Sequence, residues 1–316
     1  LTKVIATTAA VMKLYEQGLL DVDAKLASYL PEFQGDTPEQ IHMKGNVTIR
    51  HLLTHTAGLP AFDHFHKIAG TSQARWNAVV ATKLRTPPGT ECVYSDIGFM
   101  LLGKVVEKLS GKSLDQFVQD EIFTPLAMGD TMFCPPEAIK ARILPTEKLP
   151  ETDNCVWGYV HDENARSLGG VSGHAGLFST AGDLAVFGQM LLGKGMYHDK
   201  TIFKPDTITM FTRRADIVPQ NSLCLGWDSP SDKACGGVYI SDTGFGHTGF
   251  TGTSMWMDPP RQLLVILLTN AVHPERSRKN PKYFEWRQRL HAAVYECFPD
   301  MPRNLKLQWC REWQEK

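Results

Sequence analysis

Three short stretches of the chain hold residue types that together could transfer an acyl group. They are Leu1-Thr2-Lys3, Tyr94-Ser95-Asp96 and His247-Thr248-Gly249, in that order along the chain. They provide an amine, a phenol and a backbone segment that can bind a carbonyl oxygen. A string of three residues occurs by chance too often to be informative alone. The combination and its order indicate a site of serine acyl transfer.

The chemistry of such a site explains why these residue types belong together. A serine hydroxyl is a weak nucleophile until a base lies within hydrogen-bonding distance. A lysine three residues after the serine on a helix lies one turn away on the same face. We expect partial burial to lower the pKa of Lys3, so that its amine accepts the serine proton. Tyr94 is then expected to relay the proton to the leaving group, because a phenol both donates and accepts hydrogen bonds.

The nucleophile of this arrangement is expected immediately before Leu1. None of the serines in the chain is followed by a lysine three residues later. Residue 1 is not a methionine, and a helix starting there would lack a capping residue, so Leu1 is not expected to be the natural amino terminus. Two interpretations stay open: a serine precedes Leu1 in the encoded protein, or the chain binds its ligand without turnover.

The whole chain resembles the serine β-lactamase and penicillin-binding-protein superfamily, in particular the class C β-lactamase-like group of esterases, DD-peptidases and β-lactamases. Members of this superfamily carry Ser-x-x-Lys, Tyr-x-Asn and Lys/His-Thr-Gly elements in this order. The resemblance extends beyond these elements to longer strings, which are TIRHLLTHTAGLP at 48–60, LLG at 101–103, GHAGLFSTA at 173–181 and HTGFTG at 247–252.

The resemblance implies a serine hydrolase that forms an acyl-enzyme on an ester, a β-lactam or a D-amino peptide. Lys3 would be the general base and Tyr94 the proton relay. No metal or organic cofactor is implied. The substrate-binding residues would be Asp96, which orders Lys3, His174, which lines the acyl pocket, and His247, Thr248, Gly249 and Phe250, which meet the substrate carbonyl and its neighbours. The alternative is a non-catalytic relative that binds peptidoglycan or D-amino peptides.

Two residues depart from the superfamily pattern. Asp96 replaces the usual asparagine, so a side-chain amide donor becomes a carboxylate that can only accept when ionised. This carboxylate could anchor Lys3 electrostatically. His247 replaces the usual lysine of β-lactamases, and a histidine is mostly neutral at pH 7. We therefore expect weaker recognition of a substrate carboxylate, which favours an esterase or a peptidase over a β-lactamase.

Other histidines receive simpler interpretations. His51 and His55 are expected to satisfy local backbone groups. His161-Asp162-Glu163 is expected to be a polar turn. Residues 61–88 and 135–173 are expected to contribute the loops that shape the substrate pocket.

The order of secondary structure indicates an α+β fold, with an antiparallel sheet flanked by helices and a mainly helical lobe. Helices are expected at residues 1–18, 97–109, 179–192 and 283–297. Short strands are expected at 238–240, 254–257 and 263–268, with Asp258-Pro259-Pro260-Arg261 as the turn of a hairpin.

We expect one domain over 1–316 that lacks the amino-terminal edge of its family. The helical lobe would cover roughly 20–178, and the sheet lobe roughly 179–316 together with helix 1–18.

Composition supports a globular enzyme rather than a nucleic-acid-binding or membrane-spanning protein. The chain has 316 residues, a net charge of −1 and a pI of about 6.9, so nucleic acid is not an expected partner. No apolar run is long enough to cross a bilayer. The seven cysteines show no metal-binding spacing and are expected to be buried or partly buried free thiols. The resemblance favours the bacterial envelope, periplasmic or secreted, with the cytoplasm as the alternative.

Overall fold

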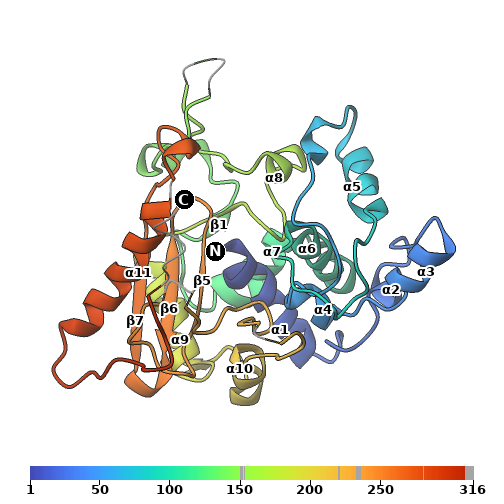
Figure 1. Ribbon diagram of the computed structural model, residues 1–316. Helices are drawn as coiled ribbons and strands as arrows, with labels where there is room; N and C mark the ends of the chain where they lie inside the picture. Colours follow the sequence, from blue (N-terminus) through green and yellow to red (C-terminus); the bar gives the residue numbers. More distant parts are fainter. Residues whose placement is uncertain (150–151, 153, 220, 233–235, 280, 310–316) are drawn as a thin grey trace.

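The computed structural model describes residues 1–149, 152, 154–219, 221–232, 236–279 and 281–309. An antiparallel sheet lies on one side of the molecule and most of the helices lie on the other (Figure 1). The amino-terminal helix runs between the two parts. The predicted α+β class is confirmed.

The elements that build this arrangement are mostly short. The α-helices are α1 (Ala9–Glu16), α2 (Leu26–Tyr29), α3 (Pro38–Lys44), α4 (Ile49–Leu53), α5 (Ser72–Ala81), α6 (Asp96–Ser110), α7 (Leu114–Val118), α8 (Glu163–Ser167), α9 (Ala181–Leu192), α10 (Pro205–Thr212) and α11 (Pro281–Glu296). The 3-10 and π-helical segments are η1 (Lys3–Thr8), η2 (Phe65–Lys67), η3 (Gln119–Phe123), η4 (Glu137–Arg142), η5 (Pro259–Arg261) and η6 (Arg276–Arg278). The strands are β1 (Met132–Phe133), β2 (Leu177–Phe178), β3 (Met196–Tyr197), β4 (Lys200–Thr201), β5 (Phe245–Thr248), β6 (Ser254–Asp258) and β7 (Leu263–Leu267).

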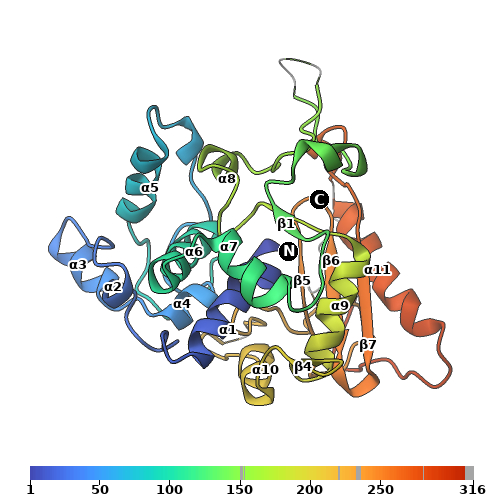
Figure 2. The same cartoon turned by 180° about the vertical axis from the view of Figure 1, so that it is seen from behind.

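The main sheet has the strand order β5-β6-β7, and all of its pairs are antiparallel. Asp258 pairs with Leu263 across η5, which confirms the predicted hairpin. Helix α9 covers one face of the sheet (Figure 2), where the absence of a side chain at Gly188 lets the helix approach Met255 and Leu264. Helix α11 lies on the opposite face, where Tyr295 packs with Trp256.

Residues 238–240 form bends rather than the predicted strand. Val238 and Ile240 are nevertheless buried in the small core between the sheet and α11. The β-branched side chains of these residues therefore indicated a buried segment and not a paired strand. The reason is that β propensity largely reflects packing on a half-buried surface.

The site-bearing helix α6 begins and ends where its sequence predicts. The Ser95 hydroxyl accepts a hydrogen bond from the Gly98 N–H at the amino end. Gly111 ends the helix with a φ of +69°, in the left-handed region that glycine adopts without strain. Helix α9 is likewise capped by Thr180, as predicted.

The amino-terminal helix is almost completely buried. Its first turns, from Lys3 to Thr8, are π-helical, and it continues directly into α1. It packs against α6, α7 and α10 and occupies the centre of the molecule (Figure 1). The lobe boundaries proposed above stay a prediction. The central position explains how Lys3 reaches residues from both parts of the fold.

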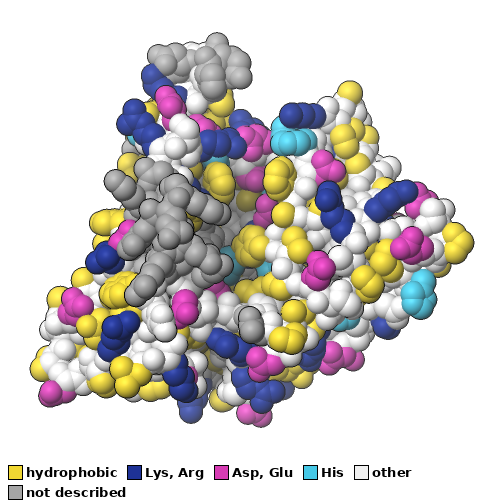
Figure 3. Space-filling model, viewed as in Figure 1, with side chains coloured by type: hydrophobic (Ala, Val, Ile, Leu, Met, Phe, Trp, Pro, Cys, Tyr) yellow, Lys and Arg dark blue, Asp and Glu magenta, His cyan; other side chains and the backbone are white. Residues whose placement is uncertain are grey.

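The surface agrees with the balanced composition. Figure 3 shows Lys and Arg side chains intermixed with Asp and Glu on the face viewed in Figure 1. No helix of the described chain is long and apolar enough to cross a membrane. The cysteines within the described residues are free thiols, as predicted, but their burial was predicted only in part: Cys224 is buried and Cys155 partly buried, whereas Cys92, Cys134 and Cys297 are exposed. Cys235 and Cys310 lie outside the described residues.

Candidate active site

Lys3 and Asp96 form an ion pair in the centre of the molecule. The Nζ atom of Lys3 donates to Oδ1 of Asp96 at 2.6 Å, between the first helical turn and the start of α6. The Lys3 side chain is only 8% exposed. A second acceptor, the backbone carbonyl of His174, lies 3.5 Å from the same nitrogen. Two segments far apart in the sequence therefore aim oxygen atoms at one ammonium.

The expected lowering of the Lys3 pKa is wrong in direction. Burial does favour the neutral amine, but Tyr94 and the carboxylate of Asp96 act against it and hold the pKa of Lys3 above its ordinary value. Lys3 is therefore an ammonium at neutral pH in this arrangement. The anchoring role expected of Asp96 explains the sign, because a carboxylate at hydrogen-bonding distance stabilises the charged form.

Tyr94 lies next to Lys3, with the ammonium 4.8 Å from the centre of its ring. On the other side its ring packs at 4.2 Å against the ring of His55. The Nδ1 atom of His55 accepts the Ser95 N–H, so His55 binds a backbone group 40 residues away rather than the local one predicted. Burial raises the pKa of the Tyr94 phenol, so the phenol keeps its proton at neutral pH. His55 thus also positions Tyr94, a role that its sequence context did not predict.

His247 connects Tyr94 to strand β5. Its Nδ1 lies 2.7 Å from the carbonyl oxygen of Thr248, and a carbonyl only accepts, so Nδ1 carries the proton. The other nitrogen, Nε2, must then accept from the Tyr94 hydroxyl, 3.4 Å away. Burial, together with the positive charge of Lys3, holds the pKa of His247 well below its ordinary value. His247 is therefore neutral, as its sequence context predicted.

The end of β5 lies beside the start of the chain. The backbone nitrogen of Leu1 is 3.4 Å from the position that a Cβ atom on Gly249 would occupy. Any such Cβ would also lie 2.2 Å from the Thr253 hydroxyl, so only glycine fits here. The Gly249 N–H donates to the Thr253 carbonyl, whereas the Phe250 N–H donates to no acceptor within the described part of the chain. The Phe250 N–H is thus available to a carbonyl oxygen.

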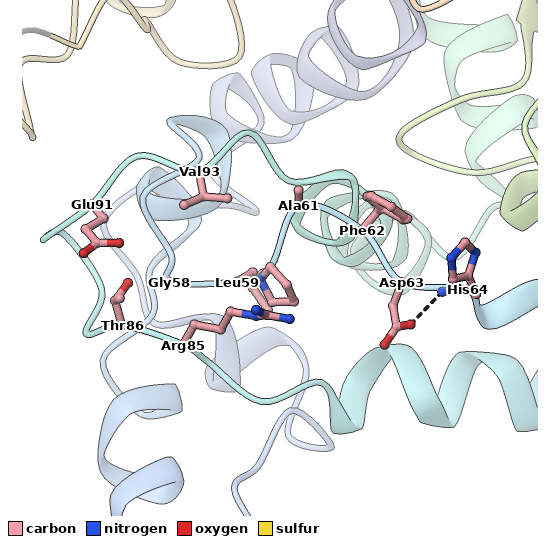
Figure 4. Close-up of a pocket in the computed structure, with 11 residues that line it drawn as sticks. Gly58, Leu59, Ala61, Phe62, Asp63, His64, Arg85, Thr86, Glu91 and Val93 are labelled. Atoms are coloured by element: carbon pink, nitrogen blue, oxygen red, sulfur yellow. Dashed lines mark hydrogen bonds between the residues drawn. The ribbon is translucent and has the colours of Figure 1, made fainter. Parts of the chain in front are cut away.

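A cavity of about 570 Å³ lies behind the Tyr94-Ser95-Asp96 segment, between residues 58–64 and 85–93 (Figure 4). The backbone of Pro60 and Ala61 forms the boundary: the Ser95 hydroxyl donates to the Pro60 carbonyl, and the Asp96 N–H donates to the Ala61 carbonyl. Part of its lining, at residues 61–64, 85 and 86, comes from the loop 61–88 that was expected to shape a pocket, and the rest comes from the residues flanking that loop. Lys3 and His247 are not part of this lining.

The segment His161-Asp162-Glu163 is more than the polar turn predicted. Asp162 binds Nε2 of His174 at 2.8 Å, His161 stacks on Phe250, and Glu163 binds Arg276 at 2.6 Å. The turn therefore connects the back of the site to the loops that follow β5 and β7. No spacing signal in the sequence links these residues.

The His174 side chain does not line an open pocket. It is 1% exposed, and both ring nitrogens are occupied, by Asp162 and by the Ser172 hydroxyl. The substrate contact expected of this side chain is replaced by the contact between its backbone carbonyl and Lys3.

An ionic cluster joins the loop before α8 to the loop after β7. Arg276 binds both Glu147 and Glu163, and Glu147 also binds His161. Burial alone would raise the pKa of Glu147, but Arg276 and His161 outweigh it and lower this pKa to about 2.

Replacing Glu147 by glutamine should lower the free energy of unfolding at pH 7 by about 1 kcal/mol, a small value because Arg276 is half exposed. The carboxyl has a depressed pKa in the folded state, so its contribution is present above its ordinary pKa of 4.5 and is lost as pH falls toward 2. Urea unfolding at several pH values measures this. A difference between variant and wild type that stays constant from pH 7 to pH 2.5 would contradict it.

No group of three metal-ligating side chains occurs in the part of the chain that the structure describes.

Comparison with family models matches residues 1–289 to the model described as Beta-lactamase. An N-acetylmuramyl-L-alanine amidase of Bacillus subtilis is 38% identical, over 93% of this chain and 74% of the relative. A putative D-alanyl-D-alanine carboxypeptidase of Escherichia coli K12 is 36% identical, over 93% of this chain and 73% of the relative.

Solved structures share the fold at lower identity. Simvastatin synthase from Aspergillus terreus has a TM-score of 0.70 at 20% identity, covering 95% of this chain and 83% of that one. A penicillin-binding protein homologue from Caulobacter crescentus has a TM-score of 0.67 at 20% identity, with 94% and 82% covered. The hydrolase EstCE1 has a TM-score of 0.66 at 21% identity, with 92% and 83% covered.

Proposed function

Because the chain belongs to the β-lactamase family of serine hydrolases, we propose that it hydrolyses an amide bond of a cell-wall muropeptide through a serine acyl-enzyme. The observation that carries this proposal is the convergence of Lys3, Asp96 and Tyr94 beside the end of β5. The names of these two relatives describe an amidase for N-acetylmuramyl-L-alanine and a carboxypeptidase for D-alanyl-D-alanine, and both reactions cleave an amide bond.

The nucleophile in this proposal is a serine encoded immediately before Leu1. The Leu1 carbonyl already accepts helical hydrogen bonds from Val4 and Ile5, so the preceding residue would extend the helix. A side chain there would lie one turn before Lys3 on the same face. It would also lie next to Gly249, because the Leu1 nitrogen does.

The reaction then follows from the positions of the side chains. The serine oxygen attacks the amide carbon while its proton passes to the free amine form of Lys3, and the oxyanion accepts the Phe250 N–H. The C–N bond breaks as the proton passes through the Tyr94 hydroxyl to the leaving amine. Water attacks the acyl-enzyme by the same route in reverse, releasing the acid and restoring the serine.

The neutral state of His247 bears on the substrate. A lysine at this position would attract a carboxylate next to the scissile bond, and a neutral imidazole does not. This supports an amide without an adjacent carboxylate, as in a muramyl-peptide linkage, over a terminal D-alanine or a penicillin.

Covalent labelling and turnover measurements on the full-length protein test the proposal. We expect a phosphonate or fluorescent penicillin probe to label the serine before Leu1, as located by mass spectrometry. We also expect release of peptide from a muramyl-peptide amide to exceed release of alanine from a D-Ala-D-Ala peptide. Probe labelling of another serine, such as Ser95, would refute the mechanism. No labelling and no turnover would leave the non-catalytic binding protein as the function.

Replacing His247 by lysine should shift the preference between substrates. The ratio of kcat/KM for a carboxylate-bearing D-Ala-D-Ala peptide to that for a neutral p-nitrophenyl ester should rise by about fivefold, the value of one partly exposed ion pair. Added salt should reduce part of the gain. If the ratio does not change, His247 does not set the charge preference of the site.

A further inference from the structure

A chain of three hydrogen-bonded side chains, two of them buried and one partly exposed, lies near the proposed catalytic lysine. The Ser172 hydroxyl is 2.9 Å from Nδ1 of His174, and Nε2 of the same ring is 2.8 Å from Oδ1 of Asp162. Ser172 and His174 are both less than 9% exposed. Asp162 is also fixed from its own side, because it caps α8 by accepting the Ala165 N–H at 2.7 Å.

The backbone of residues 172–174 is held tightly against the catalytic helix. The Thr7 hydroxyl, one turn after Lys3, donates to the Gly173 carbonyl at 2.7 Å. A Cβ atom on Gly173 would lie 2.0 Å from the Phe99 carbonyl oxygen, so only glycine permits this approach to α6. The next carbonyl, that of His174, points at the Lys3 ammonium. A shift of the His174 backbone would therefore move an acceptor of Lys3.

We propose that Asp162 is a positioning residue for Lys3: by holding the His174 ring, it fixes the His174 carbonyl against the ammonium and places a second carboxylate behind it. The inference rests on the proposed function, because Lys3 is taken as the base. Asp162 does not itself touch the reacting atoms.

The electrostatic effect of Asp162 on Lys3 adds to that of the other groups that face the ammonium. Asp96 faces the ammonium from α6, Tyr94 from the preceding segment, neutral His247 from β5, and His55 from the end of α4. Burial would raise the pKa of Asp162, but His174, and more weakly Lys3, hold it well below its ordinary value. The carboxylate is therefore ionised at neutral pH, and its charge acts on Lys3.

Two variants distinguish the positioning role of the Asp162 side chain from the effect of its negative charge on Lys3. Asp162→Asn keeps an oxygen that can cap α8 and accept from His174, but it removes the charge. Asp162→Ala removes both. The matched control is Asp183→Ala, which also removes a carboxylate that binds backbone and side chain, at Asp130 and Thr131, away from Lys3.

In the full-length protein, we expect Asp162→Ala to lower kcat on a muramyl-peptide amide by about 10- to 100-fold, with KM changed less than about threefold. We expect Asp162→Asn to move the acidic limb of the pH profile to lower pH, because the loss of a nearby negative charge lowers the pKa of Lys3. Asp183→Ala should lower the melting temperature without moving this limb.

A second readout does not depend on turnover. NMR titration of the Lys3 amine, assigned with a Lys3→Ala spectrum, should give a lower midpoint in Asp162→Asn than in wild type. If the protein does not turn over muramyl amides, the proposed function fails and this titration alone decides the role of Asp162. An unchanged Lys3 midpoint, or an Asp162→Ala variant that behaves like Asp183→Ala, overturns the inference.

Discussion

Replacing Lys3 by alanine is expected to slow acylation of the full-length protein by about 10²–10⁴-fold, the usual contribution of a positioned base. The Lys3 side chain is buried, hydrogen-bonded to Asp96, and one helical turn from the proposed nucleophile. Within the described residues near β5, neutral His247 already accepts from Tyr94 and cannot replace the amine. Stopped-flow labelling with a phosphonate probe measures the rate constant.

A second buried lysine provides the control for this experiment. Lys44 donates to the carbonyls of Gln34 and Val80, and burial lowers its pKa to about 8, but it lies on α3 outside the site. Lys44→Ala should lower the melting temperature and leave the acylation rate per folded molecule near that of wild type. Labelling of Lys3→Ala at near wild-type speed would remove Lys3 from the mechanism.

The sequence predicted a helix or a turn well where the residues that determine it are close together in the chain. The predicted helix at 97–109 corresponds to α6, and the predicted turn at Asp258-Pro259-Pro260-Arg261 corresponds to the hairpin between β6 and β7. The same reasoning failed at 238–240, because β-branched residues are equally suited to a buried irregular segment. Whether such a segment pairs depends on neighbours that are distant in sequence.

The site was predictable in its parts but not in its connections. The order of Lys3, Tyr94 and His247 indicated their convergence, and the structure brings them together. The link from Asp162 through His174 to Lys3 spans 171 residues and has no fixed spacing, so the sequence carried no signal for it. The predicted direction of the Lys3 pKa shift is wrong because burial was given more weight than the anchoring carboxylate of Asp96.

The ion pair keeps Lys3, the proposed base, an ammonium at rest, and this has a kinetic consequence if the proposed mechanism operates. Only the free amine of Lys3 can accept the serine proton, so the rate should follow the small amine fraction and rise with pH through the alkaline range. Asp96 keeps the free amine fraction of Lys3 small, because its carboxylate is 2.6 Å from the ammonium and stabilises the charged form. An asparagine of the same size would keep an oxygen acceptor and remove the charge.

Replacing Asp96 by asparagine should therefore move the acidic limb of the kcat/KM profile to lower pH by about 1–3 units, the range for loss of an opposite charge at contact. At pH 7, well below the limb, this corresponds to about a 10- to 1000-fold increase in the amine fraction and thus in rate. A neutral p-nitrophenyl ester is the appropriate substrate, because it excludes effects of Asp96 on a charged ligand. Asp36→Asn, which breaks an exposed pair with Lys83, should leave the profile unchanged. A limb that stays in place in Asp96→Asn, or moves to higher pH, would show that proton transfer to Lys3 does not limit the reaction.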